Sequence, residues 1–323
     1  MLDHLSYPHI FDLILSFADD TTLMRLRTTS SDVRVKADSL LFEHVVISGA
    51  ILNEDTPMWL LSPSGSRLPM DPSASDGLGA NAVAALSHTA VMDCYRLDSA
   101  RTIADGIVKS ICPAAWRFYS IGCDRLNAVR APTAVYFRAF KPKHPTGYCL
   151  PQPSWLRHQG IGYQLHDART HVIHLSYDPH DPRLRQAQVE AFHVKPDSEN
   201  VILILDRSGS TTGVGILRAL AQAVALQPSI KFAVVGLDEM PRTVLELDPT
   251  SNWDECKEVL VERMFTIGEE AQGMMTFFRP NLPPPSPLTF FTRSEYRCLV
   301  GERRWQIQTV KPDVATPLTK RMG

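Results

Sequence analysis

Residues 201–237 read VILILDRSGSTTGVGILRALAQAVALQPSIKFAVVGL, and this stretch decides the fold. It opens with an uninterrupted apolar run at 201–205 and closes with a second one at 232–237. Between them, apolar residues recur at helical spacing, namely Leu217, Leu220, Ala221 and Val224. A buried strand, a helix and another buried strand in succession are typical of parallel strands that are covered on their faces. We therefore expect an α/β fold with an irregular, largely parallel sheet.

Other segments extend this pattern in both directions. Short runs rich in β-branched or aromatic residues predict strands at 45–47, 90–97, 116–121, 134–140, 171–177 and 288–292. A second helical pattern is formed by Trp253, Cys256, Leu260 and Met264. The spacing between strands is too uneven for a clean repeat, but a degenerate leucine-rich-type array stays open as an interpretation.

The N-terminal segment 8–42 predicts three short helices. In the first helix Pro8 suits the first helical position, and four apolar residues fall at positions i, i+3, i+4 and i+7, namely Ile10, Leu13, Ile14 and Phe17. The second helix places Leu23 and Leu26 on one side, and the third follows Ser30. Helices this short cannot each bury a full face alone, so we expect them to pack together and against a partner.

These segments suggest a division of the chain. We expect a helical module at 1–47, a linker with a flexible loop at 48–89, an α/β domain at 90–310 and a C-terminal tail at 311–323. The loop is predicted because residues 62–81 are rich in Ser, Pro and Gly and contain few periodic apolar residues.

Composition narrows the classes of partner. The chain has 323 residues, of which 44% are hydrophobic and 21% are charged, as in ordinary globular proteins. Its 33 basic and 35 acidic residues leave a net charge of -2, so we expect neither nucleic acid nor a membrane surface as partner. Six widely spaced cysteines without a C-x-x-C pair, and an N-terminus without a secretory pattern, indicate a cytoplasmic or nuclear protein with reduced thiols.

The N-terminal segment also resembles a known module. Residues 5–17, LSYPHIFDLILSF, followed by 23–30, LMRLRTTS, resemble an F-box. The continuation at 38–46, DSLLFEHVV, resembles the F-box proteins of basidiomycete fungi. Three later stretches are similar to segments of such proteins, namely HLSYDPHDP at 174–182, VGLDE at 235–239 and RSEY at 293–296.

The resemblance implies a protein that binds other proteins and catalyses no reaction. It implies docking on a Skp-type adaptor of a cullin-RING ubiquitin ligase, with the remaining chain selecting an unknown target protein. The contact would be a helix laid in a groove. The residues expected to contact the adaptor are Pro8, Ile10, Leu13, Ile14, Phe17, Leu23 and Leu26. The competing interpretation is that the three helices simply cap the α/β domain.

A second candidate site follows the strand at 201–205. Asp206, Ser208 and Ser210 form Asp-x-Ser-x-Ser, which resembles the metal-ion-dependent adhesion motif of von Willebrand A-type domains. One carboxylate and two hydroxyls suit Mg²⁺, so the alternative function is metal-dependent protein binding centred on Asp206. Such a site also needs a later Thr and a later Asp, and Asp238 has no convincing Thr beside it in the sequence. We therefore expect a polar loop without metal or cofactor.

Other chemically suggestive patterns favour structural roles. The glycines at 209, 213 and 215 match no phosphate-binding loop. His171 and His174 are three apart on a predicted strand, so they point to opposite faces and cannot share a metal. Prolines bracket the cluster at 178–181, which indicates a turn. No nucleophile motif is present, and we expect no enzyme activity.

Overall fold

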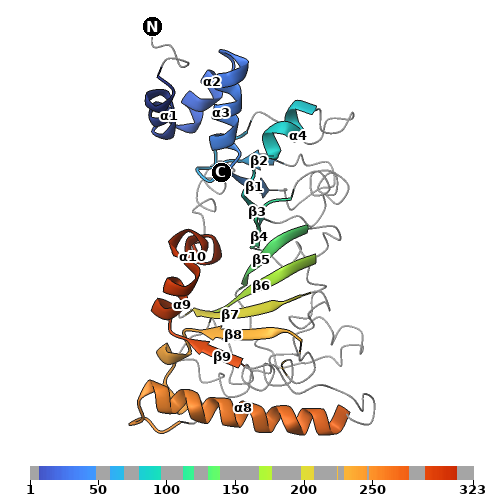
Figure 1. Ribbon diagram of the computed structural model, residues 1–323, viewed down its shortest axis with the longest axis vertical. Coiled ribbons are helices and arrows are strands. Elements are labelled where there is room, and N and C mark those ends of the chain that lie inside the picture. Colours follow the sequence, from blue (N-terminus) through green and yellow to red (C-terminus); the bar gives the residue numbers. More distant parts are fainter. Residues whose placement is uncertain are drawn as a thin grey trace, which may run out of the picture. The chain divides into compact units, whose positions relative to one another are not determined.

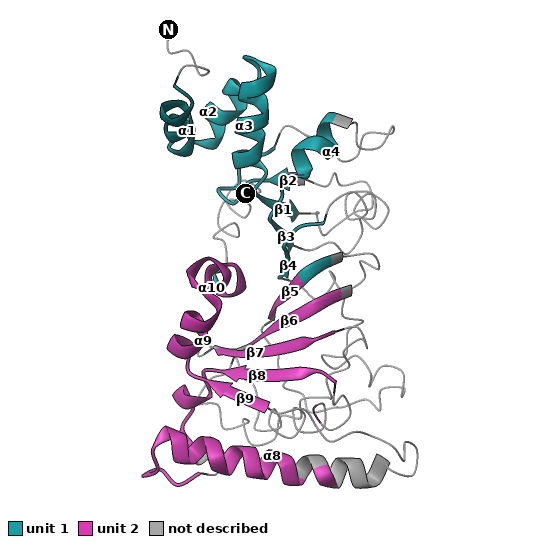
Figure 2. Cartoon of the chain, viewed as in Figure 1, with its two compact units in different colours: residues 1–132, 310–323 teal, residues 133–309 magenta. Residues whose placement is uncertain are grey.

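The computed structural model describes residues 7–48, 59–68, 80–95, 112–119, 130–138, 167–176, 198–206, 224, 229–245, 247–275 and 288–310. The chain divides into two units, residues 1–132 with 310–323, and residues 133–309 (Figure 2). Within the described residues nine strands follow the order β2-β1-β3-β4-β5-β6-β7-β8-β9 (Figure 1). The mixed α/β class and the mostly parallel sheet are as the sequence predicts.

The first unit begins with three helices, α1 (Pro8–Ser16), α2 (Asp20–Leu26) and α3 (Ser31–Leu41). Two helix starts are capped by side chains. The Asp19 carboxylate accepts a hydrogen bond from Thr22 N at 2.8 Å, and Ser30 Oγ accepts one from Val33 N at 3.3 Å. Both α1 and α2 contact α3, which in turn contacts α4 and β1. The three helices expected over 8–42 are therefore present.

The remaining elements of this unit are β1 (His44–Ser48), β2 (Trp59–Leu61), α4 (Ala80–Leu86), β3 (Val91–Tyr95) and β4 (Ala115–Phe118). Strand β1 pairs antiparallel with β2 and parallel with β3, and β3 pairs parallel with β4. The core of the unit is apolar and includes Phe42, Val46, Met92, Trp116 and Phe118.

Part of the segment expected to be a flexible loop is folded. Ser62 and Leu68 are buried, Leu68 N donates to Leu60 O at 2.8 Å, and Ser62 Oγ donates to Asp20 Oδ2 at 2.5 Å. Gly65 has a φ of +85°, a conformation that glycine adopts without steric cost. Residues 62–68 thus form a turn anchored to the start of α2, and residues 69–79 lie outside the described residues.

The second unit contains most of β5 (Arg130–Arg138) and all of β6 (Asp167–Ser176), β7 (Asn200–Asp206), β8 (Lys231–Val235) and β9 (Leu288–Phe291). Strands β6 to β9 are paired in parallel. Its helical elements are η3 (Leu237–Glu239), η4 (Arg242–Leu245), α8 (Trp253–Met275), α9 (Arg293–Val300) and α10 (Glu302–Thr309).

Within residues 201–237, the described parts form the predicted strands. All five residues of the apolar run at 201–205 are buried in β7, and the run at 232–237 forms β8 and the start of η3. Helix α8 buries Cys256, Leu260 and Met264 at the predicted spacing. The helical pattern between β7 and β8 lies outside the described residues, apart from the buried Val224.

The strand order has a functional consequence. Strand β1 lies between β2 and β3. From β3 to β9, each described strand lies beside the next one in the sequence. Doubly wound sheets reverse their strand order at one point, and ligands bind in the crevice that the reversal opens. The described sheet changes direction once, at β1 between β2 and β3, but β2 is antiparallel to β1, so this is not the reversal between parallel strands of a doubly wound sheet. None of the described helices is long and apolar enough to cross a bilayer.

Candidate functional site

The outer face of α1 carries the apolar residues that the sequence singled out. Within this α1 face the exposed fractions are 37% for Ile10, 59% for Leu13, 48% for Ile14 and 84% for Phe17. Leu15, on the opposite side, is 1% exposed and anchors the helix. Scattered apolar side chains are normal on protein surfaces, but four at helical spacing form a continuous stripe of the kind that marks an interaction site.

Helix α1 is held in place by α3. Lys36 Nζ lies 2.5 Å from Asp12 Oδ1, and the same ammonium lies 5.8 Å from the centre of the Phe11 ring. Asp12 is the acidic side chain of α1, and it forms an ion pair with Lys36. The contacts to α3 therefore use one side of α1 and leave an uncharged apolar face on the other.

The remaining predicted contact residues divide into two groups. Pro8 is exposed in the first turn of α1. A proline is tolerated there because the backbone N–H that it lacks would have no acceptor within the helix. Leu26 is half-buried, whereas Leu23 is 5% exposed. Leu23 thus belongs to the core of the helical module and is closed to a partner in this conformation. Spacing alone could not separate it from its exposed neighbours.

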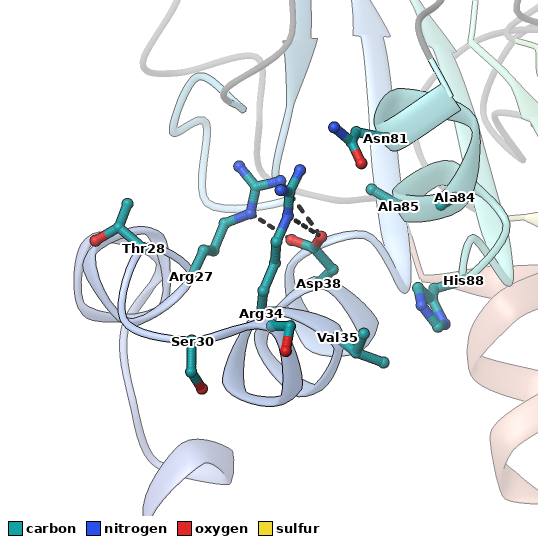
Figure 3. A pocket seen from close by; sticks show the side chains of 11 residues that line it. Arg27, Thr28, Ser30, Arg34, Val35, Asp38, Asn81, Ala84, Ala85 and His88 are labelled. Carbon is teal, nitrogen blue, oxygen red and sulfur yellow. Dashed lines mark hydrogen bonds and ion pairs between the residues drawn. The ribbon is translucent and has the colours of Figure 1, made fainter.

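A cavity of about 740 Å³ lies between α3 and α4 (Figure 3). Arg27 and Arg34 line it together with Asp38, whose carboxylate both guanidinium groups approach. The sequence analysis did not find this site. Its local signal is the Arg34 and Asp38 pair at i and i+4 on α3, but the position of α4 opposite them is not visible in the sequence.

A charged cluster is buried among β1, β3 and β4. Asp93 is fully buried, Arg117 Nε lies 2.9 Å from Asp93 Oδ1, and His44 Nε2 lies 2.8 Å from Asp93 Oδ2. The Arg117 guanidinium also donates to the Tyr119 hydroxyl and to Val310 O. Asp93 and Arg117 are direct neighbours in the parallel register. Since the charges are paired within the cluster, we interpret it as a brace that joins three strands to the segment after α10.

The second unit contains the residues of the metal hypothesis. Asp206 ends β7, but Ser208 and Ser210 lie outside the described residues. Asp238 lies in η3, and burial raises the pKa of its carboxyl above the ordinary value. No group of three potential metal-ligating side chains occurs in the described part of the chain.

The two strand histidines have separate partners, as their spacing predicts. His171 Nε2 lies 2.8 Å from Ser198 Oγ, and the His171 ring stacks on Tyr136. His174 Nε2 lies 2.5 Å from Gln308 O, and its ring stacks on Phe137. Both are buried, so their contacts are those of packed core residues.

No protein-family model, curated protein or solved structure matches the chain.

Proposed function

We propose that this protein is a non-catalytic adaptor, the target-recognition subunit of a cullin-RING ubiquitin ligase. In this proposal the α1 face docks on a Skp-type adaptor protein, and the parallel sheet selects the target. The observation that carries the proposal is the exposure of Ile10, Leu13, Ile14 and Phe17 on a helix whose other side is fixed to α3.

The size of the α1 face suits a protein contact. The exposed parts of its four side chains correspond to a little over two complete side chains. Burial of these parts would contribute about 4 to 5 kcal/mol, and a matching apolar groove on the partner would contribute a similar amount. Association costs at least about 4 kcal/mol, so these contacts leave a net of about 4 to 6 kcal/mol, which corresponds to a Kd from about 1 mM down to tens of micromolar.

The chemistry of the face selects the partner. Residues at i, i+3, i+4 and i+7 are the anchors of a helix that lies in an apolar groove. The four side chains of the face are apolar, and Asp12, the acidic side chain of α1, is paired with Lys36 on the α3 side. The segments 5–17, 23–30 and 38–46 resemble an F-box, and this resemblance favours a Skp-type adaptor over a second copy of this chain.

The sheet supports the target-binding part of the proposal. Sequential parallel strands occur in leucine-rich-type arrays, in which neighbouring strands create an extended surface for protein recognition. The described strands β3 to β9 follow such an order. We propose that this protein uses its sheet in the same way.

The test measures binding of the full chain to a purified Skp-type adaptor by titration calorimetry. We expect a Kd of roughly tens to hundreds of micromolar for the wild-type protein and loss of binding for Ile14→Asp, because an unpaired charge buried in an interface costs several kcal/mol. Pro8→Ala should retain binding, since it affects only the start of α1.

A matched control places the same charge on another exposed apolar helix position. Val259 of α8 is 44% exposed, close to the 48% of Ile14. Val259→Asp should bind the adaptor as the wild-type protein does. Absence of wild-type binding at about 1 mM, or equal loss in both Asp variants, would refute the proposal.

A further inference from the structure

The cavity between α3 and α4 has an unbalanced charge. Arg27 contacts Asp38 through two guanidinium nitrogens, with Nη2 at 3.3 Å from Oδ2, and Arg34 Nε lies 3.7 Å from the same oxygen. The Asp38 and Arg27 side chains are 7% and 13% exposed, so water screens this pair poorly. Two guanidinium groups share one carboxylate, and Asp38 is the one acidic residue among the described residues that line the cavity. The cluster therefore has a formal charge of about +1.

Arg34 retains donors for a ligand. Its ion pair with Asp38 is longer than a hydrogen bond, and its guanidinium makes no hydrogen bond to any residue in the described ranges. A guanidinium carries five N–H donors in a planar fork that matches the oxygens of a carboxylate or phosphate. Figure 3 shows the Arg34 and Arg27 side chains converging on Asp38, where a second anion could join them.

Further features of the lining define the ligand. Ser30 and Ser31 lie at the start of α3, where the helix dipole favours negative charge. Val35, Ala84 and Ala85 add apolar surface from α3 and α4. A volume of about 740 Å³ is within the usual range for small-molecule sites.

We propose that this cavity binds a small organic oxyanion. Its phosphate or carboxylate group lies against Arg27 and Arg34, and its apolar body packs on Val35 and Ala84. The site shares no residue with the α1 face, because none of the described lining residues belongs to α1.

The experiment titrates the full chain with phenyl phosphate, benzoate and neutral benzyl alcohol, with calorimetry and thermal melting as readouts. At least one of the two anions should bind saturably and raise the melting temperature, and the stronger of them identifies the anionic group. Benzyl alcohol should bind at least about tenfold more weakly, because it lacks the charge.

The diagnostic variant is Arg34→Gln, since Arg34 is the more exposed arginine and its loss leaves the Arg27–Asp38 pair intact. It should retain its melting temperature without ligand but lose at least about tenfold in anion affinity. The charge-matched control is Arg25→Gln, on the exposed surface of α2 and outside the cavity. No saturable anion binding at about 10 mM would overturn the proposal. Equal losses in both variants, or equal affinity for benzyl alcohol, would overturn it as well.

Discussion

Phe17 provides the sharpest test of the α1 face. It is the C-terminal cap residue of α1 and is 84% exposed, the largest exposed fraction among the large apolar side chains of the described residues. Phe17→Ala removes a ring that contributes little to the folded protein alone. We therefore expect the free energy of unfolding to change by less than about 0.5 kcal/mol.

Adaptor binding should respond strongly to the same change. Full burial of a phenylalanine side chain contributes up to about 3 kcal/mol, and the exposed part of Phe17 accounts for about 2 to 2.5 kcal/mol of this. The affinity for a Skp-type adaptor should accordingly fall about 30- to 70-fold. Titration calorimetry measures this loss, and denaturant unfolding of the same samples measures the stability.

The control removes an exposed ring elsewhere. Phe265 of α8 is 51% exposed, and Phe265→Ala should leave adaptor affinity unchanged. Unchanged affinity of Phe17→Ala would refute the role of the α1 face. A loss of several kcal/mol of stability would show instead that the ring belongs to the core of the module.

Four further predictions concern stability. Leu15→Ala, at the buried anchor of α1, should lower the free energy of unfolding of the helical module by about 2 to 5 kcal/mol in denaturant titrations. Arg117→Met should cost about 3 to 5 kcal/mol because it leaves Asp93 buried without its main cation, and the double change with Asp93→Leu should recover most of this loss. Burial raises the pKa of Tyr296 to about 12, above the value of about 10 in an unfolded chain. The contribution of the protonated Tyr296 to the free energy of unfolding is therefore fully present below pH 10. It should decline by roughly 2 to 3 kcal/mol as the pH rises towards 12, and alkaline unfolding of Tyr296→Phe should lack this decline. Saturating Mg²⁺ should leave the melting temperature unchanged, and a rise that Asp206→Ala abolishes would contradict this expectation.

The sequence predicted the elements whose patterns are long or strongly apolar. Strands β3 to β9 and helix α8 overlap the segments expected from periodicity, because buried strands and an amphipathic helix leave clear signals. Strand β2 was missed because its three residues border a Ser- and Pro-rich stretch. Helix α9 was missed although Thr292 and Glu295 form a capping box and Gly301, with a φ of +79°, follows its last residue. That pattern could have been recognised.

The candidate sites were predictable to different extents. The spacing of the α1 residues identified an apolar stripe, but the exposure of Phe17 and the burial of Leu23 depend on how α1 and α2 pack on α3. The Asp93–Arg117 brace depends on the register between β3 and β4, which is a long-range property. The cavity likewise requires α4 to lie opposite Arg34, and no local pattern specifies this.

The architecture of the helical module links its stability to its proposed role. Helix α1 is nine residues long, too short to be stable in water alone, and Leu15 is its one buried side chain. Its position therefore depends on Leu15 and on the contacts of Lys36 with Asp12 and Phe11. A partner that covers the α1 face adds apolar contacts to side chains that the described residues cover only in part. Because such a partner binds only the folded helix, it must stabilise α1 by mass action. In the proposed complex, docking of the adaptor and ordering of α1 are therefore coupled, and adaptor binding should raise the stability of the helical module.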